Sequence, residues 1–164
     1  MAVKIRPIVL KDAASYRRCW DAVAKERRYI VEYKAPPLSE VRANVRKTLR
    51  KKTPLLVAAD GEHIVGFAAV YGFDLPSISH LGDFGTFLLP DYREMGLGTK
   101  LMAGVLKMSR GKFDVVRLAV FRKNKRARKL YIKMGFELCG GTKKSVKLAY
   151  GFDDMLFMQK QMRR

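Results

Sequence analysis

The stretch PDYREMGLGTKL, residues 90–101, places one arginine and two glycines between an extended apolar run and a helix-like apolar pattern. Gly96 and Gly98 carry no side chains that would keep a ligand away from the main chain. A turn that enters a helix here presents several unpaired N–H groups and the positive end of the helix dipole. We therefore predict a main-chain cradle for a pyrophosphate, with Arg93 placed to close it.

Other phosphate-binding loops fit this stretch less well. A Walker loop needs GxxxxGK[ST], whereas Gly98 is followed by Thr99 and Lys100 in the wrong order. A dinucleotide fingerprint needs a third glycine, and Leu101 stands in its place. Taken alone, the RxxGxG pattern is equally compatible with an ordinary glycine-containing loop that opens a helix.

The elements around this loop follow from hydrophobic periodicity and turn residues. We expect strands at residues 3–9, 54–60, 64–71, 80–89, 115–120, 136–139 and 154–159, and helices at residues 11–28, 39–52, 96–110 and 124–134. Asp60-Gly61 predicts a hairpin, Ser39 a helix N-cap and Gly135 a left-handed helix end. The resulting order is not that of a regular doubly wound fold. It predicts an α/β (mixed α+β) domain with a mixed sheet and helices on both faces.

A second pattern lies downstream, in LAVFRKNKRARKLYIKMGFEL, residues 118–138. Tyr131 follows Asn124 by seven residues, which is two helical turns, so both are expected on one helix face. By themselves, Asn124 is most simply an N-cap and Tyr131 a half-buried packing residue.

The composition limits the class of protein. The 164 residues predict one domain over residues 1–164, and no apolar run is long enough to span a bilayer. The N-terminal stretch lacks the features of a signal peptide, so we expect a cytoplasmic protein. Cys19 and Cys139 are expected to be buried, inert thiols, and His63 and His80 are too scattered for a metal site.

The net charge of +19 is the unusual property of the chain. Such a surface attracts polyanions and predicts at least weak association with nucleic acid or acidic proteins. Abundant charge with few Asn and Gln residues is also typical of thermophiles, although it does not explain the excess of cations. A basic cluster before and within the fourth helix has three open readings: a solvated face, a clamp for a phosphate, or a nucleic-acid patch. Its members are Arg122, Lys123, Lys125, Arg126, Arg128 and Lys129.

Together, these stretches resemble the GNAT superfamily of acyl-CoA-dependent N-acetyltransferases. The resemblance covers residues 5–158 and is strongest in HLGDFGTFLLPDYREMGLGTKLM and LAVFRKNKRARKLYIKMGFEL, with DGEHIVGFAAV similar to the hairpin that precedes them. It implies a mostly antiparallel sheet of about seven strands with a splayed parallel pair, residues 80–89 and 115–120, that binds acetyl-CoA. It implies no metal.

The resemblance also implies roles for particular residues. The main chain of Phe87 and Leu88, at a strand bulge, would bond the pantetheine arm and polarise the thioester carbonyl. Asn124 would bond the same arm, and Tyr131 would protonate the departing thiolate. The pyrophosphate would be held by the main chain of Glu94, Met95, Gly96, Leu97, Gly98 and Thr99.

This sequence departs from the family pattern at two positions. Some relatives carry a glutamate base where Ala119 stands here, so Asp83 is our candidate base, followed by His80 or a water chain. For Asp83 a salt-bridging role is an equal alternative. Relatives commonly have glycine or a basic residue where Glu94 stands, and a carboxylate there repels a pyrophosphate unless it points away.

The resemblance leaves the primary amine acceptor open. Basic residues on the expected acceptor side disfavour polycationic amines and suit an acidic small molecule, the terminus of a protein held by an acidic partner, or a protein on nucleic acid. Glu26 and Glu32 are candidates for attracting a cationic amine. The alternative to an enzyme is a non-catalytic basic module that binds RNA or the ribosome on this scaffold. A homodimer is also left open.

Overall fold

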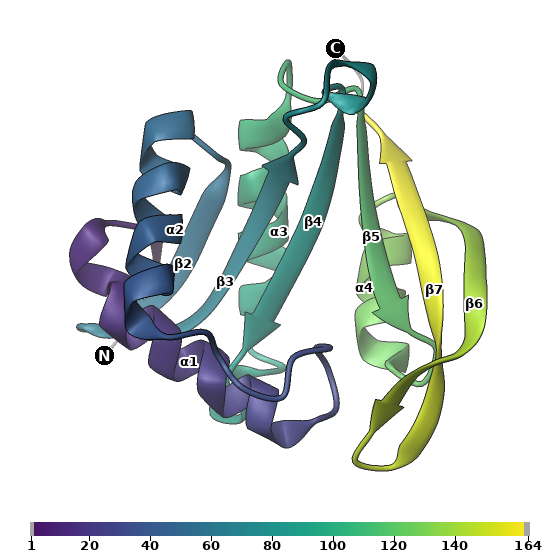
Figure 1. Cartoon of the computed structure of the whole chain (residues 1–164), viewed down its shortest axis with the longest axis horizontal. Helices are drawn as coiled ribbons and strands as arrows, with labels where there is room; N and C mark the ends of the chain where they lie inside the picture. The colour runs from purple at the N-terminus through teal and green to yellow at the C-terminus, as the bar shows by residue number, and fades with distance from the viewer. Residues whose placement is uncertain (1, 163–164) are drawn as a thin grey trace.

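One seven-stranded sheet, in the order β1-β2-β3-β4-β5-β7-β6, organises the computed structural model, which describes residues 2–162 (Figure 1). The predicted domain range of 1–164 therefore extends past the described residues by residues 1, 163 and 164. Among the described strands, β4 and β5 pair in parallel and the other neighbours pair antiparallel, as predicted. The strands are β1 (Lys4–Pro7), β2 (Leu55–Asp60), β3 (His63–Gly72), β4 (Leu81–Leu88), β5 (Val115–Phe121), β6 (Glu137–Leu148) and β7 (Gly151–Gln161).

Helices cover both faces of the sheet, which confirms the predicted layering. They are α1 (Ala13–Glu26), α2 (Leu38–Lys51), α3 (Leu97–Ser109) and α4 (Lys125–Lys133). In Figure 1, α1 and α2 lie in front of β2, β3 and β4, and α3 and α4 lie behind the sheet. Because side chains alternate along a strand, Ala68 and Val70 of β3 join the cluster that includes α3, whereas Phe67 and Ala69 join the cluster that includes α1 and α2.

The parallel pair β4–β5 separates soon after it begins. Its register contains three residue pairs, and Asp83↔Arg117 is the last of them. Beyond that pair, β4 continues to Leu88 against β3, and β5 continues to Phe121 against β7. Figure 1 shows the two strands diverging below this point. Beyond this pair, the facing edges of β4 and β5 therefore carry main-chain N–H and C=O groups that do not pair with each other.

Local details differ from the sequence predictions where tertiary packing decides. Helix α2 begins at Leu38 with Pro37 as N-cap and no side-chain cap bond, so Ser39 is not the cap. The helical spacing of Leu97, Leu101 and Val105 predicts that Met108 also faces inward, but Met108 is exposed and Ser109 is buried. The left-handed Gly135, with φ 87°, is confirmed.

The last two strands are much longer than the four and six residues expected. β6 has 12 residues and β7 has 11, joined by a tight turn, and their register shifts at two places. Nearly all of β6 is exposed, so it lacks the alternation of buried and polar residues that marks a strand in a sequence.

The connection between α1 and α2 reaches across to this hairpin. The amide of Ala149 donates to the carbonyl oxygen of Arg27 over 2.9 Å, and the hydroxyl of Tyr33 donates to the carbonyl oxygen of Lys147 over 2.6 Å. The half of the molecule that contains α1 is thereby joined to the half that contains β6 and β7 on the α1 side of the opening.

Candidate active site

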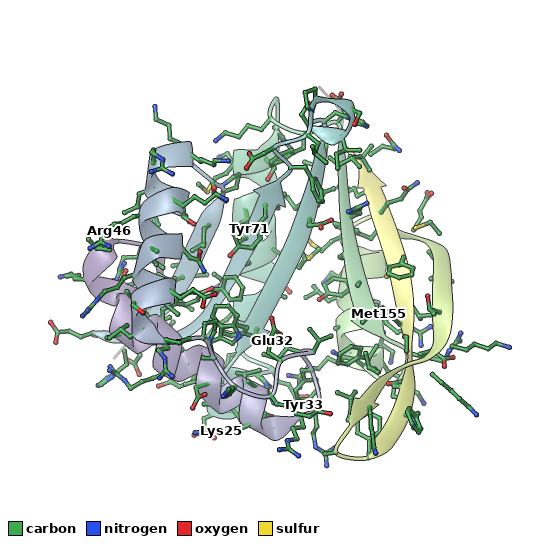
Figure 2. All side chains as sticks on the ribbon, viewed as in Figure 1. Lys25, Glu32, Tyr33, Arg46, Tyr71 and Met155 are labelled. Atoms are coloured by element: carbon green, nitrogen blue, oxygen red, sulfur yellow. The ribbon has the colours of Figure 1, made fainter. Side chains whose placement is uncertain are left out.

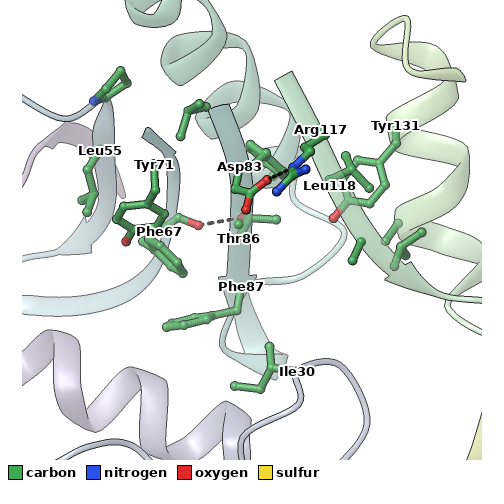
Figure 3. Close-up of a pocket in the computed structure, with 18 of the residues that line it drawn as sticks. Ile30, Leu55, Phe67, Tyr71, Asp83, Thr86, Phe87, Arg117, Leu118 and Tyr131 are labelled. Carbon is green, nitrogen blue, oxygen red and sulfur yellow. Dashed lines mark hydrogen bonds and ion pairs between the residues drawn. The ribbon is translucent and has the colours of Figure 1, made fainter. Parts of the chain in front are cut away.

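The opening between β4 and β5 is a cleft of about 1390 Å³ that passes between the two halves of the sheet. Figure 3 shows side chains from β3, β4, β5 and α4 turned toward it. On the α1 side, it is lined by Tyr71 of β3, Glu32 of the α1–α2 connection and Met155 of β7, which Figure 2 places around the opening. On the α3 side, Gly96 and Gly98 lie at its edge. Two reacting molecules can therefore approach one point from opposite faces.

The N-terminus of α3 carries uncapped main-chain donors. The first helical bond runs from the amide of Lys100 to the carbonyl oxygen of Gly96 over 3.1 Å, and the N-cap Gly96 supplies no side-chain cap bond. Gly96 adopts a φ of +75°, and a side chain at this position would meet open space. The amides of Leu97, Gly98 and Thr99 are thus the unpaired donors expected in the first turn. This geometry fits a pyrophosphate, which needs several N–H donors and the positive end of a helix dipole.

Other residues of this loop have distinct positions. Leu97 is buried and anchors the first turn of α3 in the core, whereas Met95 is exposed. Glu94 has a φ of +66°, a conformation that favours glycine, and its carboxylate accepts a hydrogen bond from Arg126 over 2.8 Å. The Glu94 carboxylate is therefore paired across the opening with α4.

The side chain of Arg93 does not close the cradle, contrary to our prediction. Its guanidinium forms two hydrogen bonds with the carboxylate of Glu26, of 2.8 and 2.5 Å, and its Nε donates to the carbonyl oxygen of Leu88 over 3.0 Å. The group also stacks on the ring of Tyr29, 4.5 Å from the centroid. A largely buried guanidinium needs such partners. The same pair removes Glu26 as a free carboxylate for attracting an amine.

The end of β4 is regular rather than bulged. Its register with β3 runs from Gly82 to Leu88 without a shift, so the predicted bulge at Phe87 and Leu88 is absent. The amide of Leu89 donates to the carbonyl oxygen of Val65 over 2.8 Å. Because main-chain groups of an antiparallel strand alternate in direction, those of Phe87 point to β3 and those of Leu88 point to the open edge.

The same alternation adds a residue that the sequence analysis missed. The main-chain groups of Thr86 also point to the open edge, two residues before Leu88. Only the register, fixed by the pairing of β4 with β3, distinguishes Thr86 and Leu88 from Phe87. The ring of Phe87 instead packs against Phe67, with centroids 4.4 Å apart.

On the far side of the cleft, α4 presents Asn124 and Tyr131. The side-chain oxygen of Asn124 accepts a hydrogen bond from the amide of Ala127 over 3.2 Å, so Asn124 is the N-cap of α4, and it also lines the cleft. Tyr131 is buried against Phe84 and Phe136, and Figure 3 shows its hydroxyl directed toward the gap between β4 and β5. Burial raises the pKa of Tyr131 well above its ordinary value, so the phenol keeps its proton at neutral pH.

The candidate base Asp83 is paired with Arg117 at the point where the strands part. The Nε of Arg117 donates to the Asp83 carboxylate over 2.5 Å, and the guanidinium lies 4.8 Å from the ring centroid of Phe73. This hydrogen bond raises the pKa of Arg117 above its ordinary value. Both side chains are about half exposed and line the cleft (Figure 3). The salt-bridging alternative for Asp83 is thus realised, and a role in proton transfer stays a prediction.

The other base candidate, His80, has an exposed side chain just before β4 and is not among the residues that line the cleft. Arg117, in contrast, was missed by the sequence analysis. The sequence pattern could have identified Arg117, because it lies between the apolar residues Val116 and Leu118. A polar residue between buried ones on a strand faces the opposite side of the sheet.

The structure also bears on the expectations for the cysteines, for a metal site and for a membrane-spanning segment. Cys19 is buried, and burial raises the pKa of its thiol to about 12, but Cys139 is exposed, contrary to our prediction. Within residues 2–162, no group of three or more His, Cys, Asp or Glu side chains is arranged to hold a metal ion. No helix in the same range is both long and apolar enough to cross a membrane.

Comparisons with known proteins agree with this geometry. The model of the Acetyltransferase (GNAT) family matches residues 15–136. The L-amino acid N-acetyltransferase AaaT of Escherichia coli (strain K12) is 33% identical over 92 residues, which are 55% of this chain and 56% of AaaT, so the match spans about half of that relative.

Two solved structures show the same fold. The GNAT-family acetyltransferase from Streptococcus pneumoniae has a TM-score of 0.91 at 22% identity, over 99% of this chain and 100% of that chain. The structure of yncA from Salmonella typhimurium with its cofactor acetyl-CoA has a TM-score of 0.90 at 17% identity, over 100% of this chain and 96% of that chain. The family model covers well over half of the 164 residues, so this chain belongs to the GNAT family of acetyltransferases.

Proposed function

We propose that this protein transfers the acetyl group of acetyl-CoA to the amine of an acceptor that also carries an anionic group. The observation that carries the proposal is the divergence of β4 and β5 beyond Asp83 and Arg117, beside the uncapped N-terminus of α3. Membership of the GNAT family supports N-acetyltransferase activity.

Acetyl-CoA, when bound, supplies an acetyl group activated as a thioester. The chain contributes the main-chain donors of Thr86 and Leu88 along the open edge of β4, and an N–H at this edge is placed to stabilise charge on a carbonyl oxygen. The donors of residues 94–99 bind the pyrophosphate. Asn124 lies on the opposite wall, where its amide can bind the cofactor arm.

The acceptor must lose a proton, because an ammonium group has no lone pair and a lysine-type amine titrates near 10.4. Asp83 lines the cleft, and its carboxylate can accept this proton directly or through water. Tyr131 holds a proton on its hydroxyl, and we propose that it donates this proton to the leaving sulfur.

The proposed acceptor class rests on Arg117, a cation that lines the cleft at the point where β4 and β5 part. Its guanidinium is half exposed and is held in place by Asp83 and Phe73, so it offers hydrogen-bond donors to an anionic group of the acceptor. The name of AaaT refers to L-amino acids, in which an amine and a carboxylate lie close together. We propose acceptors of this kind, in preference to polyamines.

Calorimetric titration of acetyl-CoA at ~0.3 M salt tests the cofactor site, because this salt concentration suppresses loose binding of polyanions. ATP and free CoA serve as controls. Saturable one-to-one binding that ATP does not reproduce supports the proposal, and a panel of L-amino acids and spermidine then tests the acceptor. No binding of acetyl-CoA would instead favour the RNA- or ribosome-binding module. A cytoplasmic location, weak nucleic-acid or acidic-protein association and a homodimer stay predictions.

A further inference from the structure

One ion pair crosses the cofactor side of the cleft. Glu94 belongs to the loop between β4 and α3, and Arg126 belongs to the first turn of α4, which follows β5. The Arg126 Nη1 and the Glu94 Oε1 are 2.8 Å apart. Because β4 and β5 have separated at this level, the pair joins the two halves of the molecule over the opening, and both residues line it.

The conformation of Glu94 is unfavourable for its residue type. A φ of +66° is one that glycine adopts freely and other residues adopt at some cost. The conformation keeps the main chain of the loop turned into α3, and it leaves the carboxylate pointing at Arg126. The loop therefore combines main-chain donors suited to an anion with an acidic side chain that repels one.

The ion pair is also well solvated. The side chain of Glu94 is 75% exposed and that of Arg126 is 54% exposed, so neither charge needs the other to offset a cost of desolvation. An exposed pair of this kind is weak and can be exchanged for another anion at little cost. The Glu94 carboxylate accepts one hydrogen bond from Arg126, whereas a phosphate group can accept two parallel hydrogen bonds from the same guanidinium, and a phosphate monoester carries up to two negative charges.

We propose that Glu94 is an internal competitor for Arg126, and that a phosphate group of the acyl-CoA displaces the Glu94 carboxylate when it binds. This inference rests on the proposed function, because it assumes that acetyl-CoA occupies the cleft beside α3. Arg126 is then a phosphate-binding residue, and Glu94 lowers the affinity of the site for its cofactor. Binding exchanges one anion for another on the same guanidinium.

Titration calorimetry of acetyl-CoA with four proteins tests the exchange: the wild type, Glu94→Gln, Arg126→Gln and the double variant. Glu94→Gln is expected to tighten binding roughly two- to fivefold. Arg126→Gln is expected to weaken it about tenfold, because a charge-assisted bond to phosphate is lost. In the Arg126→Gln background, Glu94→Gln should give a clearly smaller gain in affinity, because Glu94 then has no guanidinium to occupy.

Asp91→Asn is the matched control. Asp91 is an exposed acid of the same loop, three residues before Glu94, so its replacement changes the net charge equally. A gain from Glu94→Gln that exceeds that from Asp91→Asn, and that depends on Arg126, supports the inference. Equal gains in both variants, or no gain in Glu94→Gln, would overturn it and leave the proposed function intact. Failure of the wild type to bind acetyl-CoA would reject the proposed function and this inference together.

A comparison of CoA with 3′-dephospho-CoA identifies the competing phosphate. If the gain from Glu94→Gln is lost with 3′-dephospho-CoA, the 3′-phosphate displaces Glu94. If the gain persists with 3′-dephospho-CoA, the pyrophosphate displaces Glu94. Both results support the exchange, and they assign Arg126 to different groups of the same ligand.

Discussion

Arg93 and Glu26 form an ion pair with two hydrogen bonds, of 2.8 and 2.5 Å, that joins the loop before α3 to the last residue of α1. The same guanidinium donates to the carbonyl oxygen of Leu88 over 3.0 Å. Leu88 ends the strand whose open edge faces the cleft. Arg93 therefore ties the end of α1 to the end of β4, and we propose that it acts as a positioning residue for the cleft.

Replacement of Glu26 tests this link. Glu26→Gln leaves the largely buried Arg93 without its counter-charge, so we expect the free energy of unfolding to fall by about 1–2 kcal/mol. The KM for acetyl-CoA should rise severalfold and kcat should change less, because the reacting groups remain. Urea unfolding and steady-state kinetics measure the two effects. Glu62→Gln, at an exposed acid in the β2–β3 turn, is the control, and equal behaviour of both variants would contradict the assignment.

Removal of the Tyr131 hydroxyl tests proton donation. Tyr131→Phe keeps the ring that packs against Phe84 and Phe136, so we expect little change in stability. We expect kcat to fall roughly 100-fold, the scale of general acid catalysis. The raised pKa of Tyr131 means that the wild type keeps this proton to high pH, so no loss of activity from Tyr131 is expected up to about pH 10. Unchanged turnover of Tyr131→Phe would exclude the role.

Kinetic measurements on variants of Asp83 and Arg117 separate the two proposed roles, proton acceptance and binding of the acceptor's anionic group. Asp83→Asn should lower kcat at least tenfold, because an amide cannot accept a proton. Arg117→Gln should mainly raise the KM for anionic acceptors and leave the KM for an uncharged amine little changed. An unshifted pH profile with full activity in Asp83→Asn would leave Asp83 only its salt bridge.

The two glycines of the cradle are expected to respond differently to alanine. Gly96→Ala forces a residue with a side chain into φ +75°, which costs about 1–2 kcal/mol of stability. At Gly98 a Cβ would meet Leu130 and Leu88 at 3.7 Å, an ordinary contact, so the fold should tolerate Gly98→Ala. Thermal unfolding measures this contrast. Both variants should bind acetyl-CoA more weakly, and normal binding by both would argue against a main-chain cradle.

Asp12 predicts a pH dependence of stability. Burial raises the pKa of Asp12, but hydrogen bonds from Arg6 and from the amide of Val9 outweigh this effect, and the net pKa is lowered. A lowered pKa in the folded state means that the stabilisation is present above the ordinary value near 3.9 and is lost as the pH falls through the folded value. Asp12→Asn should cost about 2 kcal/mol at pH 7 and less below pH 3. A difference that does not vary with pH would contradict this.

Several features of the site could be predicted because they depend on neighbours in the sequence. The helix that opens after Gly96, the N-cap at Asn124 and the left-handed Gly135 are local, since each depends on a few consecutive residues and their hydrogen bonds. The mixed sheet followed from the order of these elements, because a short hairpin and a crossover helix dictate antiparallel and parallel neighbours.

The direction of each group in the site depended on register and on distant partners. Whether Phe87 or Leu88 faces the cleft is decided by the pairing of β4 with β3, and a shift of one residue would reverse it. With 34 Lys and Arg and 15 Asp and Glu, local pattern could not assign Arg93 to Glu26, 67 residues away. Sequence by itself determined the order of the elements and the position of the glycine-containing turn before α3, because short-range forces set them. Only the tertiary structure decided which charges neutralise each other, because a buried charge takes whichever partner the packed chain brings within reach.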